Sequence, residues 1–233
     1  MDPILITGAA RSGTSLVAGI VDRSRADGGE TCGPTNANPR GQYENNAIRN
    51  KITKPYLTSI SADPMGQSPL PAIARVRHDA LDMKSCKDFK RRVLGIMHNQ
   101  DVNTKRPWYI KEAKSCLIWP LWDAAFPDAK WIIVRRDRDQ IARSCVRTSF
   151  MRKFTEAEQW VEWVKFHERR FDEMREYYCN VREVWSERII EGDVTEIAAA
   201  VDWASSELIW DQEAVADFVE PMLYKREGTM VNG

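Results

Sequence analysis

The feature that most constrains the fold is a short apolar run followed at once by a loop that contains two glycines. Residues 4–6 read Ile-Leu-Ile, and the segment TGAARSGTS follows from Thr7 to Ser15. An unbroken apolar run that ends at a glycine predicts a buried strand. The apolar residues after the second glycine predict a helix from Gly13 to about Asp22. A strand, a glycine turn and a helix in this order are typical of a phosphate-binding P-loop.

The loop departs from the common P-loop pattern at one position. Gly8 and Gly13 have the G-x-x-x-x-G spacing, but Thr14 stands where a lysine usually follows the second glycine. Backbone N–H groups of such a loop surround an anion, and here Arg11 would supply the cation. The missing lysine argues against a nucleoside triphosphate. The plainer alternative is an ordinary strand–turn–helix corner capped by a hydroxyl side chain.

Apolar runs and amphipathic stretches alternate along the rest of the chain. We expect further strands at 108–110, 131–134 and 187–190, and helices at 85–99, 117–125, 155–178, 194–208 and 211–223. This alternation predicts an α/β domain of three layers with a mainly parallel sheet, like that of the P-loop NTPases. One domain would span 1–224 and a tail 225–233. Within it, 30–74 is rich in Pro, Gly, Asn and Ser and predicts an irregular substrate loop or lid.

Composition excludes several classes of partner. The 233 residues include 34 Lys plus Arg and 34 Asp plus Glu, so no overall field favours nucleic acid or a membrane surface. The five cysteines form no C-x-x-C pair, which predicts reduced thiols, no metal site and a cytoplasmic protein. No apolar run is long enough to span a bilayer. Any anion must therefore be held by a local cluster of cations.

A second motif lies after the expected strand at 131–134. The segment WIIVRRDRDQIARS places Arg136 at the carboxyl end of this strand and Ser144 in the helix that follows. Ligands of open α/β sheets bind outside the carboxyl ends of the strands, so Arg136 should face the same crevice as the first loop. Arginine can bind a phosphate through two hydrogen bonds, and serine can add a third. The alternative is a solvated basic start of a helix.

Four stretches of the chain resemble the sulfotransferase family that uses 3′-phosphoadenosine 5′-phosphosulfate (PAPS). ARSGTS at 10–15 is similar to the family's P-[KR]-S-G-T-[ST] loop, and Arg136 with Ser144 matches its second motif. NPRGQYE at 38–44 is similar to the N-P-x-G-[YF]-[WF]-E segment of the bacterial branch. The stretch from YIKEAKSC to WIIVRRD, at 109–137, is similar to the part of that branch that runs from K-[DE]-P-R to R-D-P. Ala10 and Arg138 replace two prolines of the family pattern, and only Lys225 to Gly228 faintly matches its R-K-G-x-x-G element.

This resemblance implies a role for each matching residue. The 5′-phosphosulfate would be bound by the loop residues Arg11, Ser12, Gly13, Thr14 and Ser15, and the 3′-phosphate by Arg136 and Ser144. Glu44 would be the general base, with a surface glutamate as the alternative, and Glu112 and Lys114 are weaker candidates for the site. Arg11 and Lys111 would offset charge on the leaving group, although Lys111 could equally be a lysine that extends from a strand end to solvent.

The expected activity is transfer of a sulfuryl group from PAPS to a hydroxyl or amine of a small-molecule or glycan-like acceptor. Cationic side chains would serve in place of a metal ion. Two alternatives stay open: a P-loop nucleotide or small-molecule kinase, and a catalytically silent nucleotide-binding module. A kinase would need a lysine after Gly13 and an aspartate for Mg²⁺, for which Asp137 is a poor substitute. The sequence names neither the acceptor nor the oligomeric state.

Overall fold

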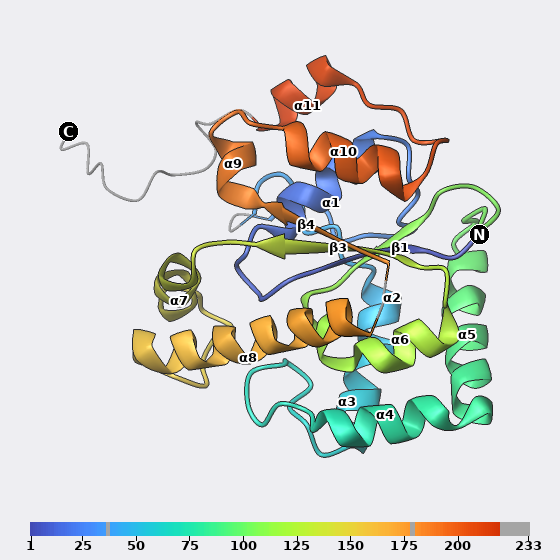
Figure 1. The fold of residues 1–233 in the computed structure, drawn as a ribbon, viewed down its shortest axis with the longest axis vertical. Helices are drawn as coiled ribbons and strands as arrows, with labels where there is room; N and C mark the ends of the chain where they lie inside the picture. The colour runs from blue at the N-terminus through green and yellow to red at the C-terminus, as the bar shows by residue number, and fades with distance from the viewer. Residues whose placement is uncertain (36–37, 178–179, 220–233) are drawn as a thin grey trace.

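The computed structural model describes residues 1–35, 38–177 and 180–219, and within them four strands form one parallel sheet (Figure 1). The strands are β1 (Ile4–Thr7), β2 (Tyr109–Lys111), β3 (Lys130–Arg135) and β4 (Val181–Trp185), in the order β2-β1-β3-β4. The predicted α/β fold with a parallel sheet is therefore confirmed. The tail expected at 225–233, with its Lys225 to Gly228 segment, lies outside the described residues.

Helices cover both faces of the sheet, which gives the three layers (Figure 1). One face carries α1 (Thr14–Arg23), α9 (Ser186–Ile190), α10 (Thr195–Ala204) and α11 (Gln212–Val219). The other carries α2 (Asn46–Ile48), the π-helical turn η1 (Arg49–Thr53), α3 (Lys54–Ser59), α4 (Ile73–Leu81), α5 (Met83–His98), the 3₁₀ turn η2 (Ala113–Ile118), α6 (Trp119–Ala125) and α8 (Ala157–Glu176). Helix α7 (Arg138–Val146) lies beyond the end of β3.

Alternating side chains of the central strands build a separate core on each face. Leu5 and Ile133 pack with α2 to α6 and α8, whereas Ile6 and Ile132 pack with α1 and α9 to α11. This alternation follows from the two-residue period of a strand. A third buried cluster joins α7 to α8 and includes Trp160. Both faces of the sheet are apolar, which explains why β1 and β3 read as unbroken apolar runs.

Two sequence predictions are wrong in detail. Residues 187–190 are helical, and the fourth strand is the preceding segment Val181–Trp185, which has Arg182 and Glu183 in its middle and is therefore no unbroken apolar run. The segment 30–74 is not irregular throughout, because α2, η1 and α3 form a nearly continuous helical rod over 46–59. The side chain of Asn45 caps that rod by accepting hydrogen bonds from the N–H groups of Ala47 and Ile48.

The chain passes from β1 to β2 on one side and then to β3 on the other side of β1. Such a reversal creates a crevice at the carboxyl ends of the strands. In the register of the sheet, Ile6 pairs with Lys111 and Thr7 pairs with Ile133. The residues that follow β1, β2 and β3 therefore emerge side by side at one edge of the sheet, where every predicted site residue lies.

Candidate active site

The loop after β1 makes a tight turn with two residues in the left-handed region. Arg11 and Gly13 have positive φ angles of 73° and 92°, and the N–H of Ser12 donates to the carbonyl of Ala9 at 3.1 Å. A Cβ atom on Gly13 would lie only 2.7 Å from Cβ of Ser186. Glycine is therefore required at position 13 both for its φ angle and for the close approach of α9.

Arg11 and Arg136 are brought together over this loop, as the two motifs predict. Nε of Arg11 donates to Oγ of Ser144 at 3.0 Å. Nη1 of Arg136 donates to the carbonyl of Arg11 at 3.1 Å, and its Nε and Nη2 donate to Oε1 of Gln140. The residues predicted to bind the two phosphate groups thus form one hydrogen-bonded unit. Gln140 completes it, four residues after Arg136.

The electrostatics of this unit favour an anion. Burial lowers the pKa of the Arg11 guanidinium, and the nearby Arg136 and Arg147 lower it further, while Cys145 opposes the change. Arginine nevertheless keeps its charge in proteins at neutral pH. Desolvated cations that lie close together gain most from an anion placed between them.

The remaining hydroxyl side chains of the loop differ in their exposure. Ser12 is fully buried, and its hydroxyl oxygen has no hydrogen-bond partner among the described residues. Thr14 is buried at the first position of α1. The Ser15 hydroxyl donates to the carbonyl of Gln42 at 3.3 Å, which attaches the loop to the segment that carries Glu44.

Glu44 lies between two cations in a largely buried position. Nζ of Lys111 donates to its Oε1, and Nη1 of Arg49 donates to its Oε2, each at 2.9 Å. Burial alone raises the pKa of Glu44, but Lys111, Lys114 and Arg49 outweigh burial and lower it to about 2. The structure thus brings Glu44 and Lys111 together, and Lys111 is only 5% exposed rather than extended to solvent.

A second ion pair lies directly beside Glu44. Nζ of Lys114 is 2.8 Å from Oε1 of Glu112, and the hydroxyl of Thr53 donates to Oε2 at 2.6 Å. Burial lowers the pKa of Lys114, but Glu112 and Glu44 outweigh it and raise that pKa overall. Two carboxylates and three cations (Arg49, Lys111 and Lys114) share this region. The region around Glu44 and Glu112 therefore carries a net charge of one positive unit.

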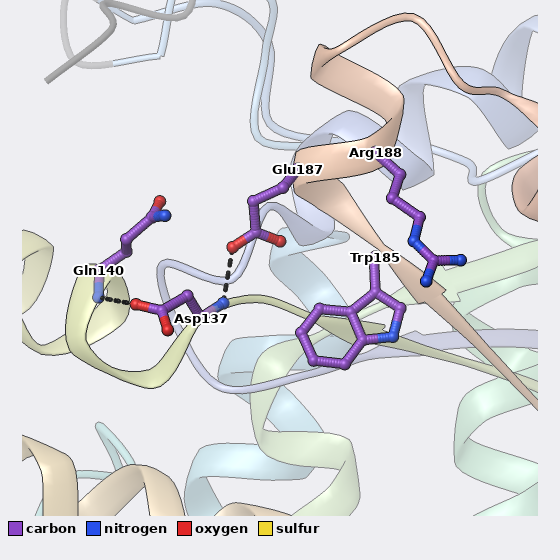
Figure 2. Close-up of a pocket in the computed structure, with 5 residues that line it drawn as sticks. All are labelled: Asp137, Gln140, Trp185, Glu187 and Arg188. Atoms are coloured by element: carbon purple, nitrogen blue, oxygen red, sulfur yellow. Dashed lines mark hydrogen bonds between the residues drawn. The ribbon is translucent and has the colours of Figure 1, made fainter.

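A hollow of about 410 Å³ is lined in part by Gln140, the partner of Arg136. It lies between the start of α7 and the end of β4 and is lined by Asp137, Gln140, Trp185, Glu187 and Arg188. Figure 2 shows the Glu187 carboxylate directed at the backbone of Asp137, whose N–H donates to Oε1 at 2.6 Å. Trp185 is 37% exposed, so part of an aromatic ring is open to a ligand.

Sequence reasoning missed several of these residues. The cations on Glu44 are Lys111 and Arg49, and Arg49 was not among the residues that the sequence indicated. No periodicity links Glu44 to Arg49, because their approach depends on the turn between them. Gln140 could have been predicted as a partner of Arg136 from its spacing, since residues four apart near a helix start can come close.

His167 is buried, with Nδ1 2.9 Å from the carbonyl of Trp163, and burial lowers its pKa to about 4.

Within the described ranges, no group of three or more His, Cys, Asp or Glu side chains is arranged to hold a metal ion. None of the helices described is long and apolar enough to cross a membrane.

The parallel sheet, with a glycine loop at its reversal point, defines a class of α/β proteins with a P-loop-like fold. The chain belongs to the sulfotransferase family, whose sequence profile matches residues 3–191. Sulfotransferase STF9 from Mycobacterium avium has a similar fold, with a TM-score of 0.55 and 15% identity over 98% of this chain and 69% of that one. Sulfotransferase STF1 from Mycobacterium tuberculosis H37Rv matches with a TM-score of 0.42 and 17% identity, over 94% and 76% of the two chains. No curated protein sequence matches.

Proposed function

We propose that this protein transfers the sulfuryl group of PAPS to a hydroxyl or amine of a small-molecule or glycan-like acceptor. One observation carries this proposal: Arg11 and Arg136 meet over a glycine loop that lacks the P-loop lysine, next to a Glu44–Lys111 pair. The arginines suit two phosphate groups, and the carboxylate suits a proton acceptor. Membership of the sulfotransferase family supports the same reaction class.

In this proposal the donor binds across the carboxyl ends of β1 and β3. Backbone N–H groups of residues 11–15, with Arg11, would hold the 5′-phosphosulfate, and Arg136 with Ser144 would hold the 3′-phosphate. Arg11 donates to Ser144 and Arg136 to the Arg11 carbonyl, and the donor's oxygens would take over from these internal acceptors. The hollow beside Trp185 adjoins this position and would take the adenine ring.

The chemistry would be an in-line displacement at sulfur. The acceptor oxygen or nitrogen forms a bond to sulfur while the bond from sulfur to the bridging oxygen breaks, and adenosine 3′,5′-bisphosphate leaves. The acceptor proton passes to the Glu44 carboxylate, while Arg11 and Lys111 stabilise the negative charge on the leaving phosphate. Positioning and charge stabilisation by fixed cations would supply most of the acceleration.

Ligand-dependent thermal stability tests this proposal without a known acceptor. Adenosine 3′,5′-bisphosphate at 100 times its Kd should add about 2.7 kcal/mol to folding stability and raise the Tm. ATP with Mg²⁺ should raise the Tm much less. Arg136→Ala should abolish most of the shift given by the bisphosphate, because it removes the cation expected at the 3′-phosphate.

Arg138→Ala is the matched control, since Arg138 pairs with Glu168 on the outer surface of α7 and α8. Its shift should equal that of the wild type. A larger shift with ATP and Mg²⁺ than with the bisphosphate would favour a kinase. Normal bisphosphate binding without sulfate transfer to any acceptor in a hydroxyl and amine panel would favour a silent nucleotide-binding module.

A further inference from the structure

Glu44, the expected proton acceptor, is already hydrogen-bonded at both of its carboxylate oxygens. Both carboxylate oxygens of Glu44 accept hydrogen bonds from cations, Oε1 from Lys111 and Oε2 from Arg49. A carboxylate held by two cations is a weak base, because their positive charges favour its ionised form. Departure of one of these cations would therefore make Glu44 a stronger base for the proposed reaction.

Lys111 is the cation that can change partner. It ends β2 and pairs in register with Ile6, and the N–H of Glu112 donates to the carbonyl of Ile6 at 3.0 Å. Only Thr7 separates Ile6 from the glycine loop, and adjacent strands lie about 4.8 Å apart. The side chain of Lys111 thus starts beside the loop that the proposed function assigns to the donor's phosphosulfate, and its four-carbon stem has the rotatable bonds needed to change partner.

Arg49 is anchored on the opposite side of Glu44, on the helical rod. Its Nη2 donates to Oδ1 of Asn46 at 2.5 Å while its Nη1 holds Glu44. The rod is fixed in turn by Asn45, which caps it and whose Nδ2 donates to the carbonyl of Gly28 and to Oε1 of Gln100. The wide π-helical turn begins at Arg49 itself, and such turns occur often at functional sites.

We propose that Glu44 is held by a two-cation clamp in which Lys111 is exchangeable and Arg49 is a permanent positioning residue. The clamp rests on the proposed function: the donor's phosphosulfate oxygens draw the Lys111 ammonium away from Oε1 of Glu44. Oε1 then becomes free to accept the acceptor's proton, while Arg49 keeps the carboxylate in place through Oε2. Donor binding therefore precedes activation of the acceptor.

A double-mutant cycle on donor-site affinity tests the exchangeable half. The probe is adenosine 3′,5′-bisphosphate, and its Kd is measured by isothermal titration calorimetry. Glu44→Gln frees Lys111 in advance, so the Kd should fall at least about fivefold, within the usual range of coupling between sites. Lys111→Met should weaken binding, and adding Glu44→Gln to Lys111→Met should give no further tightening.

The role of Arg49 as a permanent positioning residue is tested by the same measurement of the bisphosphate Kd. Arg49→Gln leaves Glu44 with Lys111 as its remaining hydrogen-bonded cation and strengthens that pair, so bisphosphate binding should weaken about two- to fivefold. The effect should vanish when Glu44→Gln is also present, because Arg49 acts only through Glu44. Arg49→Lys should restore part of the affinity. Lys51→Gln, which removes an exposed cation from the same turn, is the matched control and should leave the Kd unchanged.

Each outcome bears on the clamp. Equal tightening by Glu44→Gln with and without Lys111 would mean that the change is simple loss of a negative charge, and it would overturn the exchange. An Arg49→Gln effect that persists without Glu44 would overturn the positioning role. Circular dichroism of every variant identifies loss of fold. Absence of bisphosphate binding by the wild type would overturn the proposed function and the clamp together, whereas binding without coupling would overturn the clamp alone.

Discussion

At the scale of single residues, Gly13 is a position of the site at which two constraints exclude other residues. Its φ angle of 92° strains the backbone of any residue that has a Cβ atom. Ser186 also lies where the methyl group of an alanine would be. Arg11 also has a positive φ, of 73°, although it is not a glycine. Such strained residues tend to occur at functional sites, where the surrounding structure holds them in place.

Replacement of Gly13 by alanine should therefore destabilise the fold and the loop together. We expect a loss of at least about 2 kcal/mol in the free energy of unfolding, from the unfavourable φ and the contact with Ser186. Urea denaturation measures this loss. Gly95→Ala is the control, because Gly95 is exposed in α5 and an added Cβ would meet no atom within 4 Å. It should stabilise the protein by up to about 1 kcal/mol, and equal effects of the two variants would contradict the argument.

At the scale of elements, the sequence predicted best where local pattern decides the structure. Apolar runs located β1, β2 and β3 because strands covered on both faces need no alternation. The search for apolar runs failed at β4, because Val181, Glu183 and Trp185 are exposed or partly exposed there. It assigned the strand to the apolar end of α9 instead. The approach of Arg49 to Glu44 was unpredictable for another reason: it depends on how the chain turns at Asn45 and enters α2 between the two residues.

The corrected boundary between β4 and α9 gives a further prediction. It places Trp185 at the carboxyl end of a strand and beside the hollow, where a partly exposed indole can stack on a purine ring. Trp185→Ala should weaken adenosine 3′,5′-bisphosphate binding by about 1–3 kcal/mol, the usual contribution of base–aromatic stacking. Trp185→Phe should retain most of the affinity. Binding of inorganic pyrophosphate, which has no base, should be the same in both variants, and an equal loss with this probe would exclude stacking.

At the scale of the whole molecule, the site depends on contacts between distant parts of the chain. Lys111 meets Glu44 across 67 residues, and Arg11 meets Ser144 across 133 residues. The motifs predicted which of these residues gather at the strand ends, since a parallel sheet brings those ends together. They could not predict which charged side chains pair. The chain has equal numbers of acidic and basic residues, so composition favours no particular pair, and the side-chain geometry of the folded protein decides.

These pairings also contribute to the stability of the fold, which leads to a prediction on pH. The pKa of Glu44 is about 2 in the folded protein and 4.5 without its neighbours. The ionised carboxylate therefore stabilises the fold above about pH 4.5, and that contribution is lost as the pH falls toward 2. Glu44→Gln should lower the free energy of unfolding by roughly 3 kcal/mol at pH 7, with a smaller difference at pH 3.

Urea denaturation of both proteins from pH 3 to pH 7 measures this convergence. Glu158→Gln is the control, because Glu158 is exposed in the first turn of α8, and its curve should follow the wild type throughout. Parallel curves for the wild type and Glu44→Gln, with a constant offset, would mean that Glu44 stabilises the fold by packing rather than by charge. Converging curves would assign the stabilisation to the ionised carboxylate, which is held by the neighbouring Arg49 and by Lys111 from the end of β2.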